Sequence, residues 1–221
     1  FDLPGQFTWM LALTTLIASI IEWHPLGPKN PLIYGGLIFS IIALLIFLRI
    51  EKKAKVPILP LDLFKISNFN FLIGLGMLFN GAYYGTIFIL SLYLQQVLHY
   101  SSLSAGLAFL PLTAGFIISN LVSSKMMPKF GTRIPILIGV AIFVAGFIML
   151  LIAKDNTPYW QLFIPFFTIP LGMGLAVPAM TTGILSTVDK TRSGIASAVL
   201  NTTRQAAGAV GIAHRPRQRA Q

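Results

Sequence analysis

Long apolar runs separated by short polar connectors are the dominant pattern along this chain. A helix needs about twenty apolar residues to cross a bilayer, and a window of that length finds six spans and one weaker run. The predicted spans are Phe7–Ile21, Ile33–Leu48, Phe69–Leu98, Ser104–Val122, Ile134–Ala153 and Trp160–Leu185, and the weaker seventh run is Gly194–Ala213. The pattern predicts an all-α fold, a polytopic transmembrane helix bundle.

Composition supports a membrane protein. Only 10% of the residues are charged and 55% are hydrophobic, whereas about a quarter of an ordinary soluble domain is charged. A net charge of +10 would suggest nucleic acid as the partner of a soluble chain. Here the 16 Lys and Arg residues are spread thinly over the connectors, so we expect no nucleic-acid partner.

The cationic connectors come at every second gap between spans. Connectors 49–65, 125–133 and 190–192 are rich in Lys and Arg, whereas the alternate gaps hold only Lys29, no cation, and Lys154. The positive-inside rule therefore assigns the three basic connectors to the cytoplasm. A basic loop can also bind anionic lipid, but the topological role is the stronger interpretation.

A polar stripe runs along the third predicted span. Asn80, Tyr84, Ser91 and Gln95 recur at helical spacing and share one face. Such a stripe must face protein or water, because lipid offers it no hydrogen bonds. It either joins helices, at about 0.6 kcal/mol per contact, or lines a substrate cavity, with Phe88 adding aromatic surface for an apolar or cationic ligand. The candidate cavity residues are Asn80, Tyr84, Phe88, Ser91 and Gln95.

Small residues also share a face in the sixth predicted span. Gly172, Ala176, Ala179 and Gly183 follow at steps of four, three and four. Static close packing of helices is the favoured interpretation, and a helix that slides during transport is the alternative.

The seventh run contains a cation. An arginine at the centre of a membrane helix costs about 3 kcal/mol unless it is shielded. We therefore expect Asn201, Arg204 and Gln205 to form an interhelical polar cluster. The apolar pattern stops after Ala213, and the basic segment 214–221 would lie outside if the run spans, against the charge rule. We expect this segment to be unrelated sequence that replaces a final helix.

The chain offers no catalytic constellation. It has no cysteine, and its histidines, His24, His99 and His214, do not have the spacing of metal ligands. We therefore expect neither an enzyme nor a cofactor or metal site. Every Asp and Glu lies in a connector or at the end of a span, whereas a proton-coupled carrier normally needs an acid inside the membrane. Any coupling acid is missing from these residues.

Several short motifs carry a family resemblance. They are 1–5 (FDLPG), 60–64 (PLDLF), 92–96 (LYLQQ), 104–106 (SAG), 110–111 (LP) and 200–205 (LNTTRQ), with Gly208 and Gly211. In this order and spacing they resemble the fourteen-helix drug:proton antiporters of the major facilitator superfamily, the EmrB/QacA type. The resemblance implies two linker-type helices in 1–50, a basic cytoplasmic connector in 51–68, an incomplete C-terminal half in 69–213 and a non-family tail in 214–221.

The connector after the fourth predicted span resembles the Gly-x-x-x-Asp-Arg-x-Gly-x-Arg loop of facilitators. Lys129, Gly131 and Arg133 match its pattern, but Ser124 stands at the leading glycine and Pro128 at the aspartate. This departure puts the charge relay of that loop in doubt and favours a topological role for the two cations.

The resemblance implies a multi-pass protein of the bacterial cytoplasmic membrane, a fragment of a pump that exports drugs or amphiphiles by proton-coupled secondary transport. Its implied partners are the lipid bilayer, a small amphiphilic or drug-like substrate, protons as the coupling ion, and a periplasmic adaptor protein. The alternative is a truncated membrane protein with no transport activity of its own, because half a facilitator cannot alternate access alone.

The predicted threading can be tested by thiol labelling, because the chain has no native cysteine. Ala54→Cys and Ser124→Cys leave the charges of the basic connectors intact and should react from the cytoplasmic side only. Asn156→Cys should react from the opposite side. An impermeant maleimide applied to intact cells and to inverted vesicles measures the side, and labelling of Ala54→Cys and Ser124→Cys from opposite sides would show that the threading is wrong.

Overall fold

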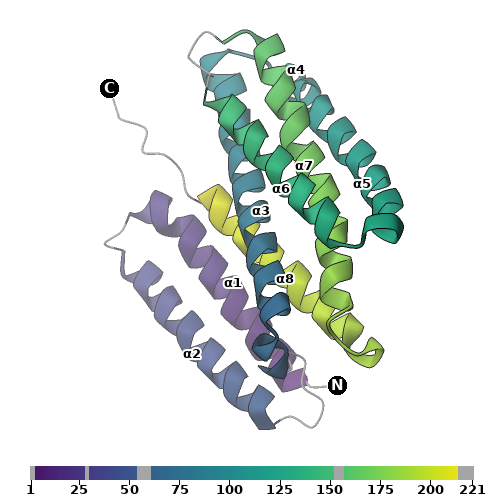
Figure 1. The fold of residues 1–221 in the computed structure, drawn as a ribbon. Helices are drawn as coiled ribbons and strands as arrows, with labels where there is room; N and C mark the ends of the chain where they lie inside the picture. The colour runs from purple at the N-terminus through teal and green to yellow at the C-terminus, as the bar shows by residue number, and fades with distance from the viewer. Residues whose placement is uncertain (1–2, 28–29, 54–60, 152–156, 214–221) are drawn as a thin grey trace. The chain divides into compact units, whose positions relative to one another are not determined.

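Helices make up almost all of the structure. The computed structural model describes residues 3–27, 30–53, 61–151 and 157–213, and these ranges contain no strand. The elements are α1 (Leu3–Leu26), α2 (Pro31–Lys53), η1 (Leu61–Lys65), α3 (Ser67–Leu92), η2 (Tyr93–Val97), α4 (Ser102–Ala108), α5 (Leu110–Phe130), α6 (Arg133–Leu150), α7 (Tyr159–Leu185), η3 (Lys190–Arg192) and α8 (Ser193–Ala213) (Figure 1). The predicted all-α fold is confirmed.

Six helical segments in the described ranges are long and apolar enough to cross a membrane. They are Pro4–Trp23, Pro31–Lys53, Ser67–Val97, Ser102–Phe130, Arg133–Leu150 and Tyr159–Leu185. Each contains or closely matches one predicted span. The weaker seventh run forms a helix, α8, that is not among the six.

Two spans depart from a plain α-helix. The third changes to a π-helix over Tyr93–Val97, where the N–H of Leu98 donates to the carbonyl oxygen of Tyr93 at 3.1 Å. The fourth is divided at Phe109 into α4 and α5. Pro111 lies in the first turn of α5. A proline is tolerated in the first turn, where the backbone N–H has no partner within the helix, whereas inside a continuous helix it would break the hydrogen-bond ladder.

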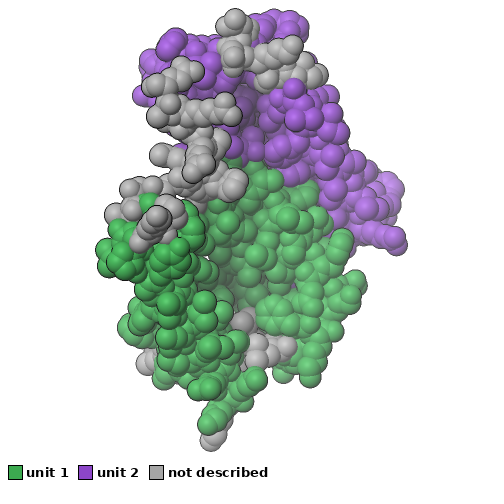
Figure 2. Space-filling model, turned by 90° about the vertical axis from the view of Figure 1, so that its left-hand side faces the viewer, with its two compact units in different colours: residues 1–85, 187–221 green, residues 86–186 purple. Residues whose placement is uncertain are grey.

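The chain forms two compact units. Unit 1 comprises residues 1–85 and 187–221, and unit 2 comprises residues 86–186 (Figure 2). In unit 1, α1 packs against α2 and α8, and in unit 2, α7 packs against α5 and α6. The four segments that the resemblance implies stay predictions, and residues 54–60 of the basic connector and the tail 214–221 lie outside the described residues.

The central helix of unit 2 is α7, and its small residues let neighbouring backbones approach closely. A methyl carbon added at Gly172 would lie 2.6 Å from the carbonyl oxygen of Gly139 in α6, and one added at Gly139 would lie 2.8 Å from the Ala176 methyl carbon. Both distances are shorter than real contacts allow, so the glycines are required here. The four small residues of the predicted face are all buried.

Hydrogen bonding joins α7 to α5 in the same unit. The Ser123 hydroxyl donates to the carbonyl oxygen of Leu175 at 2.7 Å, and both groups are buried. A methyl carbon at Gly115 would lie 2.6 Å from the carbonyl oxygen of Phe167. Small and hydroxyl-bearing residues are what membrane helices use for close contact, because lipid provides no hydrophobic drive for association.

An ion pair in unit 1 joins two connectors that are far apart in sequence. The Arg192 guanidinium in η3 donates to the Asp62 carboxylate in η1 at 2.6 Å. The hydrogen bond from Arg192 is the main cause that lowers the pKa of Asp62 below its ordinary value of 3.8. Both side chains are exposed, so the pair contributes little to stability and is screened by salt. It nevertheless places the start of α3 and the start of α8 side by side.

The close approach of α6 and α7 predicts a cost for one added methyl group. Gly172→Ala should destabilise the protein by about 1–3 kcal/mol, as overpacking typically does. Thermal unfolding of the detergent-purified protein measures the change. Gly106→Ala is the matched control, because nothing lies within 4 Å of a methyl carbon there, and it should be neutral or stabilising by up to about 1 kcal/mol. Equal effects of the two substitutions would contradict the packing described.

The Asp62–Arg192 pair predicts a pH-dependent coupling. The pKa of Asp62 is lowered in the folded protein, so its stabilisation is fully present above the unfolded value of 3.8 and is lost as pH falls through the folded value. A double-mutant cycle with Asp62→Asn and Arg192→Gln, read by thermal unfolding, should give favourable coupling at pH 7 that decreases as the pH is lowered below 3.8. The exchanged pair, Asp62→Arg with Arg192→Asp, should recover part of the coupling at pH 7. A coupling that is already lost above pH 3.8, or that is absent at pH 7, would contradict this assignment.

Candidate substrate-binding region

The first part of the polar stripe on α3 lies in unit 1. Asn80 is buried, and its side-chain amide donates to the carbonyl oxygen of Gly76 on the same helix at 2.9 Å. Tyr84, one turn later, is 43% exposed and packs against α8, where a methyl carbon at Gly208 would lie 2.8 Å from Cδ2 of its ring. The Asn80 amide therefore makes its hydrogen bond within α3. Tyr84 has a partly exposed aromatic ring.

The second part of the stripe lies in unit 2. Phe88 and Ser91 are partly exposed, and Gln95 is exposed in the π-helical turn. The Gln95 amide donates to the Ser91 hydroxyl at 3.0 Å and to the Ser91 carbonyl oxygen at 3.2 Å. These two polar side chains satisfy one another locally. The cavity-lining role of the five stripe residues stays a prediction.

Glycines of α3 face α8 within unit 1. A methyl carbon at Gly81 would lie 3.2 Å from the carbonyl oxygen of Ala207, and one at Gly85 would lie 2.8 Å from that of Gly211. The motif residues Gly208 and Gly211 of the resemblance thus lie at a real helix contact. The only sequence signal for this contact is the spacing of the glycines, Gly81 and Gly85 on α3 and Gly208 and Gly211 on α8.

Arg204 is buried on the α3-facing side of α8, with 7% of its surface exposed. A methyl carbon at Gly76 would lie 3.0 Å from its Nε atom, so the glycine makes room for the guanidinium. Asn201 and Gln205, the other members of the predicted cluster, are exposed. The two share a face of α8 next to that of Arg204, because they are four residues apart. Of the three, the structure buries only Arg204 against α3, and the joint role of the cluster stays a prediction.

The facilitator-like loop links α5 and α6 in unit 2. Gly131 ends α5 with φ 69° and ψ −176°, a conformation that is essentially restricted to glycine, and its N–H donates to the carbonyl oxygen of Met127 at 2.9 Å. Lys129, in the last turn of α5, and Arg133, the first residue of α6, are exposed. The loop therefore makes the sharp turn expected of Gly131 and presents two cations at one end of the helix pair.

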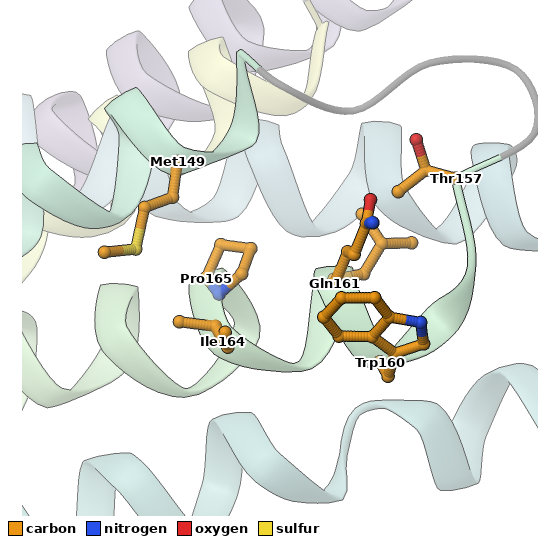
Figure 3. Close-up of a pocket in the computed structure, with 7 residues that line it drawn as sticks. Met149, Thr157, Trp160, Gln161, Ile164 and Pro165 are labelled. Atoms are coloured by element: carbon orange, nitrogen blue, oxygen red, sulfur yellow. The ribbon is translucent and has the colours of Figure 1, made fainter.

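A cavity that sequence reasoning missed lies between the end of α6 and the start of α7. Its volume is about 250 Å³, and it is lined by Met149, Thr157, Trp160, Gln161, Leu162, Ile164 and Pro165 (Figure 3). None of the predicted cavity residues of α3 is among them. The sequence signal here was Trp160 at a span end, which indicates a membrane interface but not a cavity. The described residues contain no group of His, Asp or Glu that could hold a metal ion.

Comparisons with known proteins agree with the membrane fold. The chain is 36% identical to the Methylenomycin A resistance protein of Bacillus subtilis over 96% of the chain and 46% of that protein. It is 29% identical to the Methylenomycin A resistance protein of Streptomyces coelicolor, over 95% of the chain and 44% of the relative. It is 26% identical to the Multidrug transporter protein MdtP of Bacillus subtilis, over 96% of the chain and 39% of the relative.

The chain thus spans less than half the length of these curated relatives. The superfamily resemblance drawn from the short motifs is confirmed, while the fourteen-helix type stays a prediction. The Major Facilitator Superfamily model matches residues 5–212, which is nearly the whole sequence. With six apolar helices of membrane-spanning length, this chain is a multi-pass membrane protein that belongs to the Major Facilitator Superfamily.

Proposed function

We propose that this chain supplies part of a pump that exports amphiphilic or drug-like compounds across the bacterial cytoplasmic membrane by proton-coupled secondary transport. The observation that carries the proposal is the superfamily match over residues 5–212 in a chain with six apolar helices of spanning length. Relatives named for methylenomycin A resistance and for multidrug transport support the substrate class.

The packing of α7 suits a helix that moves during transport. Pro165, Pro170 and Pro178 lie inside this helix, where each removes a backbone hydrogen bond and favours a bend. Its buried small residues bring it into backbone contact with α6. Alternating access requires packed helices to shift against one another around a central site, and interfaces of small residues present few interlocking side chains to resist this.

Among the stripe residues, Tyr84 is the best placed to contact a ligand. Its ring is partly exposed, while its other face is held by Gly208 of α8. An aromatic face binds apolar groups and attracts cations. The Asn80 amide, by contrast, donates to the carbonyl oxygen of Gly76 on the same helix. We therefore propose that Asn80 stabilises α3 within the binding region.

Proton coupling is the part of the proposal that needs residues outside this chain. Its six Asp and Glu residues all lie in connectors or at the ends of spans. The coupling acid would come from the rest of the transporter, since the chain spans less than half of its relatives. For the same reason we expect the chain expressed by itself to export nothing, and a periplasmic adaptor stays a prediction of the resemblance.

Export can be tested with a chimaera. The chain is joined to the part of the Bacillus subtilis Methylenomycin A resistance protein that it does not match, and is expressed in a host without drug pumps. The chimaera should lower the accumulation of methylenomycin A or of a cationic dye, a protonophore should abolish the effect, and the chain alone should give none. If the chimaera reaches the membrane but exports none of the tested compounds, the proposal is wrong.

The role of Tyr84 can be separated from that of the fold in the same assay. Tyr84→Ala should reduce export of a cationic dye by about 2- to 30-fold, the range equivalent to a cation–π contact of about 0.5–2 kcal/mol. Leu78→Ala is the control, because Leu78 also lies on α3 in unit 1 and is highly exposed. Equal losses in the two variants would remove Tyr84 from the binding region.

A further inference from the structure

The cavity between α6 and α7 has a polar end and an apolar end. Figure 3 shows Thr157, Gln161 and Trp160 at one end of the cavity, and Met149, Ile164 and Pro165 at the other. The Gln161 amide can donate and accept hydrogen bonds, and the Trp160 indole can donate one. The lining contains no charged residue. A ligand that fits it has a neutral polar linkage at one end and an apolar chain at the other.

The cavity lies at the membrane surface opposite the basic α5–α6 turn. Lys129 and Arg133 flank the start of α6, and the cavity is at its other end. An α-helix of 18 residues is about 27 Å long, close to the thickness of the hydrocarbon core. Trp160, 66% exposed at the start of α7, has the position that tryptophan favours at membrane interfaces.

Exposed apolar side chains lie near the cavity on α6 and α7. Leu151 is 83% exposed, and Ile148 and Phe163 are also exposed in a chain that spans the membrane. Met149, Trp160 and Ile164 in its lining are exposed too, while Leu162 and Pro165 in its wall are fully buried. Exposed apolar surface on a membrane-spanning chain suits contact with lipid, and a concave site there would give a lipid more contact than a convex helix face.

The volume of the cavity limits how much of a ligand it can enclose. Pockets that enclose drug-sized molecules hold about 300–1,000 Å³, whereas this cavity holds about 250 Å³. We propose that it binds the ester linkage and the adjoining first part of one acyl chain of a phospholipid from the leaflet opposite the basic connectors, while the rest of the chain stays in the bilayer. The ester carbonyl accepts from Gln161 or Trp160, and the chain lies along Met149 and Ile164. Binding is independent of headgroup charge because the lining has none, and it does not depend on the export proposal.

The test uses the whole chain reconstituted in vesicles of equal phosphatidylcholine and phosphatidylglycerol. The protein is extracted in mild detergent, and retained lipid is counted by native mass spectrometry. We expect one tightly held phospholipid, with either headgroup retained within about twofold. Met149→Phe, which fills the apolar end, should lower its occupancy at least fivefold, and Gln161→Leu should lower it at least twofold. Ile148→Phe is the matched control, because Ile148 is exposed next to Met149 but does not line the cavity, and it should retain the lipid.

Three results would overturn the proposal. The first is equal retention in Met149→Phe, Gln161→Leu and the unchanged chain. The second is retention of phosphatidylglycerol alone, which would assign the lipid to the basic connectors. The third is displacement of the lipid from the unchanged chain by tetraphenylphosphonium ion, added as a model drug, together with weaker binding of this ion to Met149→Phe. That result would make the cavity a drug site. If Met149→Phe fails to fold by circular dichroism, Gln161→Leu decides the outcome.

Discussion

Hydrocarbon offers a polypeptide no hydrogen-bond partner, and this constraint shapes the whole chain. Each backbone N–H and C=O inside the membrane must bond within its own segment, so the spans are helical from end to end. Where the α-helical ladder changes, another helical arrangement replaces it. The π-helix after α3 and the immediate restart of α5 after α4 are examples, and in neither place is backbone left as an open loop at membrane depth.

The same solvent explains why small residues lie at several helix contacts. Lipid tails are as apolar as leucine, so burial of large apolar side chains gives little drive for helices to associate. Close approach of the backbones favours association instead, through dispersion and through short polar contacts such as the hydrogen bond from the Ser123 hydroxyl to the carbonyl oxygen of Leu175. Two separate contacts, α6 with α7 and α3 with α8, use glycines against backbone atoms of the partner helix. At these contacts, close fit between the helix backbones contributes to the association of the helices.

The spans could be predicted from sequence because a long apolar run in a bilayer is stable only as a transmembrane helix. Their ends could not, since α5 continues past the predicted end at Val122 to Phe130, through a segment that contains polar and charged residues. The Asp62–Arg192 pair was beyond prediction because its partners are 130 positions apart. The cavity at Trp160 was missed for another reason, because its lining combines residues from two helices and the connector between them. Polar patterning on α3 predicted a shared face, but it could not show that the Asn80 and Gln95 amides bond to their own helix.

The π-helical turn at Tyr93–Val97 changes the rotational phase of the residues after it. A π-helix takes more residues per turn than an α-helix, so side chains beyond it face a direction that uninterrupted α-spacing would not give them. The span ends where this turn ends, at Val97, so the change of phase acts on the direction in which the chain leaves the membrane toward α4. It leaves the glycine contacts earlier in α3 unaffected, because those residues precede the turn.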